Sequence, residues 1–481
     1  MNTSERVFKE RVATRRESPF LRVLKLSGKY LLLLSAMLTM SCQFYSNFFR
    51  SADYFRFQTF AGSTGSYVIG RLAKSQQDGI FSSGGLIGTA SLLSGSSEPI
   101  TDDQFAIYFQ KLKIVDYKPY KSTSAIQGII FSMIDKATHF SPQINIKIFR
   151  MFTSVLTSLV FIMIIYWIYY YFGSVPAFFV FLSIVISPWL TIAGGHLYWV
   201  LGTFYLPFIA TAFLLHLEKE KNYYQRKISI AVIFFAVLGK CLFTGYELVT
   251  TSLVMMTIPY FFYAIYAEWE VSIFLDRLTK ASACAIAAVM TSMVILVMQI
   301  AVVDGSLDSG FKHIVKKFFV RTSGTRIRAD RISQEDLWTR AKNSIEADRA
   351  SILKIYFESE ALNFENFRGG PQEDTEASVL SVSFAKLMVL FAIASMVLLL
   401  VSRFVDTGAL RKNAALIVSA WVSVLAPFSW FLIFKRHSYM HPFLDNLAWH
   451  MPFTLLGFAI CGAAIASFFK QLFRVLRFNA E

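Results

Sequence analysis

The chain has 481 residues, of which 55% are hydrophobic, 16% aromatic and 16% charged. At this composition a water-soluble protein has too few polar residues to cover its surface, so a soluble globular protein is excluded and many membrane spans are predicted. Clusters of Lys and Arg beside apolar segments account for the net charge of +15, so this charge does not indicate a nucleic-acid partner. The four cysteines show neither metal-ligand spacing nor a disulfide framework.

About ten apolar segments are each long enough to cross a hydrocarbon core of about 30 Å. They are 28–48, 151–172, 175–193, 197–216, 228–243, 247–266, 281–303, 381–402, 414–434 and 449–468. The run 228–266 would be about 58 Å long as one helix, so it must turn back on itself near 239–251. The predicted fold is therefore all-α, a polytopic transmembrane helix bundle of about ten spans.

The positions of Lys and Arg predict the orientation, because short basic segments stay in the cytoplasm. Basic residues gather before the first span, after the fourth and eighth spans, and in the tail, all on one side of a ten-span protein. Both termini are therefore expected in the cytoplasm. The predicted layout is a leader 1–27, a first span 28–48, an outer loop 49–148, spans two to seven in 149–303, a second outer loop 304–380, spans eight to ten in 381–468, and a tail 469–481.

The two outer loops have distinct patterns. In the first, apolar residues recur at helical spacing over 101–112 and 125–137, which predicts surface helices, and "SSGGLIG" predicts a turn. In the second, residues 311–331 carry seven Lys or Arg against one Asp. This basic stretch is either a solvated surface or a face that receives lipid phosphates or a phosphate-bearing substrate. Neither loop has an N-x-Ser/Thr motif, which favours a bacterial inner membrane.

Lys240 and Glu247 are the only charged side chains in the run 228–266. Ionisable groups at membrane depth are costly, so they pair with one another or line a wet cavity. Two interpretations follow for this turn. The ammonium and the carboxylate neutralise each other across one helix face, or they open with Tyr246 into an outer cavity that binds a polar ligand.

Two other outer turns carry candidate binding residues. His196 follows a Gly-Gly bend between the third and fourth spans, and Lys435, Arg436, His437 and His441 lie between the ninth and tenth. Histidines four apart share a helix face, as a metal site needs, but no third ligand is evident. A metal site, a phosphate site and an interfacial anchor remain open. The candidate substrate-binding residues are therefore Lys240, Tyr246, His196, Lys435, Arg436, His437 and His441.

The layout resembles that of the GT-C superfamily of integral-membrane glycosyltransferases. The shared features are a cytoplasmic N terminus, a long first outer loop with surface helices, and a second large outer loop late in the chain. In that superfamily a carboxylate soon after the first span acts as a base or metal ligand, and "SADYFRF" offers Asp53 there. The resemblance implies Asp53 or Glu247 as the catalytic base. If a divalent metal ion takes part, Asp53 and Asp78 are the expected ligands.

The function that this resemblance implies is transfer of a sugar from a polyprenyl-phosphate-linked donor to an extracytoplasmic glycan, lipid or protein. Such transfer needs a general base for the acceptor hydroxyl and cations for the departing phosphate. The expected partners are membrane lipid, the lipid-linked sugar and the acceptor. An O-antigen-type polysaccharide polymerase or ligase is an alternative, because such enzymes use Arg and His from late loops. A non-enzymatic transporter or flippase is the third class.

Overall fold

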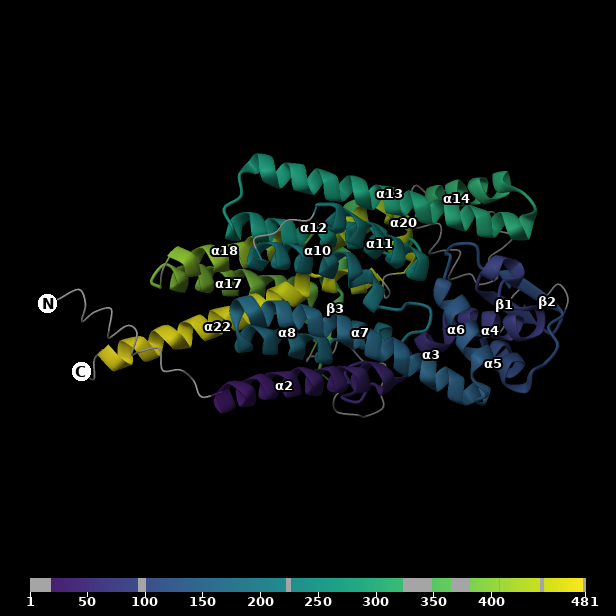
Figure 1. Ribbon diagram of the computed structural model, residues 1–481, viewed down its shortest axis with the longest axis horizontal. Coiled ribbons are helices and arrows are strands. Elements are labelled where there is room, and N and C mark those ends of the chain that lie inside the picture. The colour runs from purple at the N-terminus through teal and green to yellow at the C-terminus, as the bar shows by residue number, and fades with distance from the viewer. Residues whose placement is uncertain are drawn as a thin grey trace.

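The computed structural model describes residues 19–93, 101–221, 226–322, 348–364, 381–405, 407–441 and 445–478. Helices dominate these segments, and two pairs of short antiparallel strands complete them (Figure 1). In chain order the elements are α2 (Pro19–Ser46), α3 (Tyr54–Ser63), α4 (Ser66–Asp78), η1 (Ser82–Gly85), β1 (Gly88–Ser91), α5 (Thr101–Gln110), β2 (Asp116–Pro119), α6 (Ile126–Ala137), α7 (Pro142–Phe172), α8 (Ser174–Ile186), α9 (Pro188–Gly194), α10 (Gly202–Lys221), α11 (Arg226–Thr244), α12 (Val249–Tyr266), α13 (Val271–Asp304), α14 (Leu307–Thr322), α16 (Arg349–Glu358), β3 (Glu360–Asn363), β4 (Ser381–Ser383), α17 (Phe384–Ser402), α18 (Thr407–Val422), α19 (Leu425–Ile433), α20 (Lys435–Met440), η4 (Asn446–His450) and α22 (Phe453–Phe478).

Within the described residues, seven helical segments are long and apolar enough to cross a membrane. They are Pro142–Phe172, Lys227–Thr244, Val249–Tyr266, Val271–Asp304, Phe384–Ser402, Thr407–Ile433 and Asn446–Arg474. The pair α8 and α9, bent by 70°, makes an eighth if it is a single span. Each of these segments lies over a predicted one, which confirms a multi-pass helical membrane protein.

The count of ten spans stays a prediction, because two predicted spans have weaker counterparts in the structure. The apolar part of α2, Tyr30–Ser46, is shorter than the seven long segments. α10 lies over 197–216 but contains Pro207 and ends in charged residues, and it is not among the seven.

The structure extends some helices beyond their apolar segments. α13 begins at Val271, ahead of the predicted start at 281, because its early charges are paired. Arg277 donates to both carboxylate oxygens of Glu218 on α10, at 2.9 and 2.7 Å. Lys280 pairs with Asp276 one turn earlier. Paired charges let a helix continue past the apolar boundary that hydropathy detects.

The helices α3 to α6 and the strands β1 and β2 form a lobe at one end of the bundle (Figure 1). We call it the outer lobe, after the predicted outer loop 49–148 that forms it. The start of α2 and the end of α22 lie at the opposite end of the molecule. The two helices predicted in this loop form as α5 and α6, and both pack against α4. The antiparallel pairing of β1 and β2, which the sequence pattern did not predict, completes the lobe.

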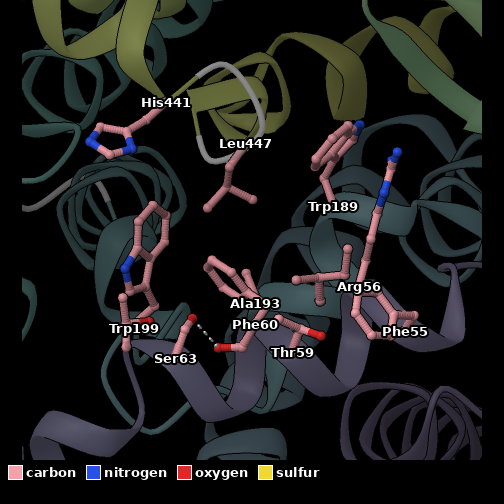
Figure 2. A pocket seen from close by; sticks show the side chains of 12 residues that line it. Phe55, Arg56, Thr59, Phe60, Ser63, Trp189, Ala193, Trp199, His441 and Leu447 are labelled. Carbon is pink, nitrogen blue, oxygen red and sulfur yellow. Dashed lines mark hydrogen bonds between the residues drawn. The ribbon is translucent and has the colours of Figure 1, made fainter. Parts of the chain in front are cut away.

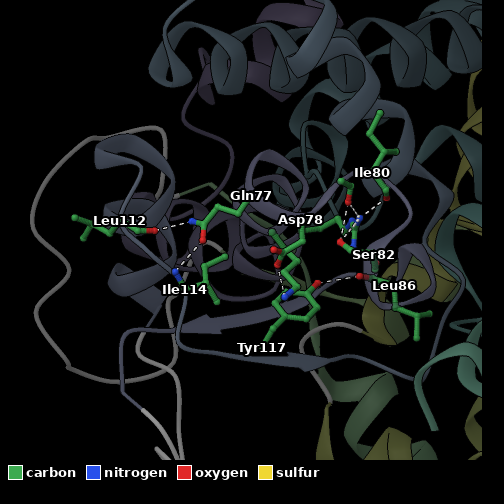
Figure 3. A network of polar contacts seen from close by, with 11 residues as sticks. Gln77, Asp78, Ile80, Ser82, Leu86, Leu112, Ile114 and Tyr117 are labelled. Atoms are coloured by element: carbon green, nitrogen blue, oxygen red, sulfur yellow. Dashed lines mark hydrogen bonds and ion pairs between the residues drawn. The ribbon is translucent and has the colours of Figure 1, made fainter. Parts of the chain in front are cut away.

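Side-chain hydrogen bonds to the backbone hold the outer lobe together. Arg71 is fully buried, and its guanidinium donates to the carbonyl of Gly79 at 2.9 Å. The Gln77 amide donates to the carbonyl of Leu112 at 2.7 Å and accepts from the backbone N–H of Ile114 at 3.0 Å (Figure 3). Because buried backbone groups need partners, these side chains determine the path of the loops around α4.

The predicted glycine-rich turn forms η1 and fastens the lobe to the end of α13. Gly84 has φ +65°, and a Cβ there would lie 2.5 Å from the carbonyl oxygen of Gln299, so the contact needs glycine. The Gln299 side chain donates to the carbonyl of Gly84 at 3.1 Å. Nearby, the Lys121 ammonium lies 2.5 Å from the Asp304 carboxylate.

The late outer segments fold back over the same end of the bundle. α14 runs beside α13 and contacts α20 (Figure 1). α16 packs against α19 and α20, and the strands β3 and β4 pair beside α9 and α17. Segments far apart in the sequence therefore meet at the outer end, where the candidate site lies.

Candidate functional site

The turn between α11 and α12 presents Glu247 and buries Lys240. Lys240 is 1% exposed, and its ammonium donates to the backbone carbonyls of Gly245 at 2.8 Å and Glu247 at 2.6 Å. Gly245 (φ +61°) and Leu248 (φ +48°) adopt left-handed conformations, so the turn is not helical. The interpretation that Lys240 neutralises the Glu247 carboxylate is therefore wrong, because the ammonium binds the carbonyl groups of the turn instead.

The carboxylate of Glu247 is bound by residues from the two late outer segments. Arg321 at the end of α14 donates to one carboxylate oxygen at 2.7 Å, and His437 Nε2 lies 3.4 Å from the other. Burial alone would raise the pKa of Glu247, but Arg321 and then His437 lower it to about 2. The same carboxylate raises the pKa of Arg321 despite burial. The pair is therefore ionised throughout the physiological pH range.

His437 lies between two carboxylates. Its Nδ1 is 3.2 Å from the Asp445 carboxylate, and its Nε2 faces Glu247. Burial alone would lower the pKa of His437, but Asp445 and Glu247 raise it above the ordinary value. Arg321, Glu247, His437 and Asp445 thus form a chain of alternating charge, which we call the Glu247 cluster.

The Glu247 cluster faces a cavity of about 380 Å³ that we call the polar cavity. Its charged and imidazole lining comes from the turn between α11 and α12, from α14 and from α20 with the residue that follows it. Its aromatic lining comes from the outer lobe and the segment before α10. The lining residues are Thr64, Tyr67, Tyr120, Tyr198, Trp199, Glu247, Lys317, Val320, Arg321, Arg436, His437, Met440 and His441. Convergent charges beside aromatic rings are typical of a binding site for a polar ligand.

His441 lies at the mouth of the polar cavity and is exposed. Its ring centroid is 4.7 Å from that of His437. The protein around its ring, and then the positive charge of His437, lower the pKa of His441. The two neighbouring imidazoles therefore differ in protonation near neutral pH, because His437 favours the charged form and His441 the neutral form. A neutral imidazole is able to accept a proton from a bound hydroxyl.

A second cavity, of about 410 Å³, adjoins the polar cavity and is mainly apolar (Figure 2). We call it the aromatic cavity. Phe55 and Phe60 of α3, Trp189 of α9 and Trp199 surround it, while His441 approaches from the other side. The polar and aromatic cavities share three lining residues, namely Thr64, Trp199 and His441. The two cavities therefore suit one amphiphilic ligand, with its apolar part in the aromatic cavity and its polar part in the polar cavity.

Neither Asp53 nor Asp78 is among the lining residues of these cavities. Asp53 caps α3 by accepting from the backbone N–H of Arg56 at 2.7 Å, and Asp78 lies 2.5 Å from the Lys74 ammonium on α4. No group of three or more His, Cys, Asp or Glu in the described part of the chain could hold a metal ion. The roles of Asp53 and Asp78 as metal ligands and of Asp53 as a base therefore stay predictions.

The other predicted binding residues divide into two groups. Arg436, His437 and His441 line the polar cavity, whereas Lys240, Tyr246, His196 and Lys435 do not. Tyr246 faces a cavity between α12 and α13. His196 is buried; its Nδ1 accepts from the backbone N–H of Tyr198 at 3.0 Å, and its Nε2 lies 2.9 Å from the carbonyl of Phe60. His196 therefore fixes the segment that carries the aromatic lining.

Three residues of the site were not among the predicted site residues. Arg321 and Lys317 belong to the basic stretch 311–331. The sequence offered this stretch as a possible phosphate-binding face but did not show which of its cations reach the site. Asp445 is 0% exposed and acts through His437. Its role was not evident because an Asp in a polar outer turn is usually solvated.

Comparisons with protein-family models, with curated proteins and with solved structures found no match to this chain.

Proposed function

We propose that the protein is a membrane glycosyltransferase that moves a sugar from a polyprenyl-phosphate-linked donor to an acceptor hydroxyl at the outer end of the bundle. The observation that carries this proposal is the polar cavity, where Arg321, Lys317 and Arg436 meet a neutral His441 beside aromatic rings. The cations suit a phosphate, the imidazole suits an acceptor proton, and the adjoining aromatic cavity suits an amphiphile.

The aromatic lining supports a sugar as the transferred group. The rings of Tyr67 and Tyr120 are stacked with centroids 4.8 Å apart, and Tyr198 lies edge-on to Tyr120 at 6.2 Å. A pyranose ring has apolar C–H faces that pack on aromatic rings, while its hydroxyls bind polar groups at the edges. The polar cavity offers both kinds of surface within one volume.

The transfer step assigns one task to each group. The acceptor hydroxyl oxygen attacks the anomeric carbon, and the bond from that carbon to the phosphate oxygen breaks with its electron pair going to the phosphate. His441 accepts the hydroxyl proton, which balances the step. Arg321, Lys317 and Arg436 stabilise the charge that grows on the departing phosphate. Glu247 and His437 position Arg321 and His441 rather than react.

The test is a transfer assay with the purified protein in liposomes, a polyprenyl-phosphate-linked sugar donor and short-chain lipid or glycan acceptors. We expect release of polyprenyl phosphate together with a glycosylated acceptor. Lys435→Gln is the matched control for Arg436→Gln, because Lys435 is the adjacent residue and does not line the polar cavity. Arg436→Gln should weaken donor use by about tenfold, the value of one charge-assisted bond to phosphate. Equal activity of both variants would remove Arg436 from the site.

An O-antigen-type polymerase or ligase is the second candidate. The observation that favours it is that Arg321 and His437, from two late outer segments, meet on Glu247. A polymerase or ligase would consume a diphosphate-linked oligosaccharide and transfer several sugars together. The same liposome assay separates the two functions, because mass spectrometry of the product shows either one added sugar or a whole oligosaccharide.

A further inference from the structure

A third cavity, of about 220 Å³, is lined in part by Arg321 and shares no lining residue with the aromatic cavity. We call it the lipid cavity. Its lining is apolar where it comes from α12, α13 and α19, whereas most of its basic residues come from α14. It shares Lys317 and Arg321 with the polar cavity. The lining residues are Lys121, Ser122, Tyr246, Val249, Thr250, Leu253, Val289, Met293, Leu296, His313, Ile314, Lys317, Phe318, Arg321, Ile433 and Phe434.

The charged residues of this cavity suit an anion. Lys317, His313 and Lys121 line it together with Arg321, and no carboxylate side chain is among the described residues that line the cavity. Lys121 is paired with Asp304, but no carboxylate within the described segments forms an ion pair with Lys317. Arg321 and Lys316 repel the Lys317 ammonium, and an anion beside Lys317 would relieve that repulsion.

Two polar atoms in this cavity are buried without a partner. Within the described part of the chain, neither His313 Nε2 nor Thr250 Oγ1 has a hydrogen-bond partner. Leaving a buried polar group unpaired costs about 1–3 kcal/mol, so such groups usually bind a ligand, an ion or water. The two orphaned atoms lie on α14 and α12, on the lining of the same cavity.

We propose that the lipid cavity binds the phosphate-proximal end of the donor's polyprenyl chain, with the phosphate at Lys317 and Arg321. Apolar and basic residues that line one cavity match a long-chain monophosphate, whose charge and hydrocarbon are adjacent. The lipid cavity and the aromatic cavity adjoin the polar cavity through different residues, so donor chain and acceptor approach from different sides. This inference rests on the proposed function and names the donor subsite.

The test measures lipid binding rather than transfer. Native mass spectrometry of the detergent-solubilised protein would quantify bound polyprenyl monophosphate, with uncharged polyprenol, phosphatidylglycerol and inorganic phosphate as comparison probes. We expect Lys317→Gln to weaken binding of the monophosphate by about tenfold. Lys316→Gln is its matched control, because Lys316 is the neighbour on α14 and lies outside the cavity. Met293→Trp fills the apolar wall and should abolish binding of both polyprenol and its phosphate.

Unchanged affinity in both Lys317→Gln and Met293→Trp would overturn the inference. It would also be overturned if Thr59→Trp, which fills the aromatic cavity instead, were the variant that blocks the monophosphate. If inorganic phosphate bound as tightly as the polyprenyl monophosphate, the cavity would be an anion site only. If phosphatidylglycerol bound as tightly, it would be a general lipid site. Either result rejects the donor subsite. If the monophosphate binds as expected but no sugar is transferred, the proposed function fails and the lipid-phosphate site stands.

Discussion

Asp135 in the outer lobe and Glu247 at the end of the bundle are both buried carboxylates, but their partners differ. Asp135 accepts from the Tyr108 hydroxyl, from Asn145 at 2.8 Å and from Gln76 at 3.0 Å, all neutral donors. Glu247 is bound by a guanidinium and an imidazole. Asp135 lines none of the three cavities described above, whereas Glu247 lines the polar cavity.

The difference shows how a buried polar network is assigned to structure or to function. Neutral donors around Asp135 satisfy one carboxylate and leave nothing for a ligand, so that network specifies the lobe. The Glu247 cluster keeps charges of both signs at a cavity wall, where they are accessible to a ligand. Mutations should therefore separate the two clusters, with changes at Asp135 affecting stability alone and changes at the Glu247 cluster affecting activity.

The largest effect is expected from Arg321→Ala, because it leaves the Glu247 carboxylate buried beside an empty position. Breaking a buried pair by removing one partner costs about 3–5 kcal/mol. Thermal unfolding in detergent should show a clear loss of stability, and transfer should cease. Arg321→Ala combined with Glu247→Gln should recover most of the stability but none of the activity. If the double variant were as unstable as the single one, the pair would not be the source of the effect.

The next effect is expected from His441→Gln. The substitution keeps a hydrogen-bonding side chain but removes the proton acceptor, so transfer should fall by about 10²–10⁴ while the unfolding temperature holds. In the parent protein, the lowered pKa of His441 predicts that the acid limb of the rate profile lies below about pH 6.5. A profile with its acid limb above that value would assign the base to another group.

Tyr108→Phe tests the other side of the comparison. It removes one donor from Asp135, which should cost about 1–3 kcal/mol of stability because the carboxylate stays buried. Sugar transfer per folded molecule should not change, since the outer lobe network does not reach the polar cavity. Equal losses of transfer and stability would show that the lobe also controls the site.

The smallest effect is the pH dependence of the Glu247 cluster. The folded state raises the pKa of His437, so the stabilisation is present below the unfolded value of about 6.5 and is lost as the pH rises through the folded value. The difference in unfolding temperature between the parent protein and His437→Gln should therefore shrink on the alkaline side. A difference independent of pH would mean that His437 contributes packing and neutral hydrogen bonds alone.

Much of the fold follows from local patterns. The apolar segments predict the long helices because burial in a bilayer requires about the same length of apolar helix everywhere in the chain. The helices over 101–112 and 125–137 follow from amphipathic spacing, and the turn at Gly84 follows from its glycines. The sequence did not predict the strands β1 and β2, because each has only four residues. They are stabilised by pairing with each other and by the packing of β1 against α4.

By itself, the sequence determined that this protein has several apolar helices long enough to cross a membrane and that costly charges stand at the turns between them, because apolar runs and isolated ionisable residues are local properties. Only the tertiary structure decided the partners of those charges. Lys240 and Glu247 are only seven positions apart, yet the left-handed turn directs the ammonium to backbone carbonyls. Arg321 reaches Glu247 because α14 folds back along α13, and His437 reaches it because α20 packs on α14. Such long-range contacts depend on how helices pack, which no pattern within a single segment encodes.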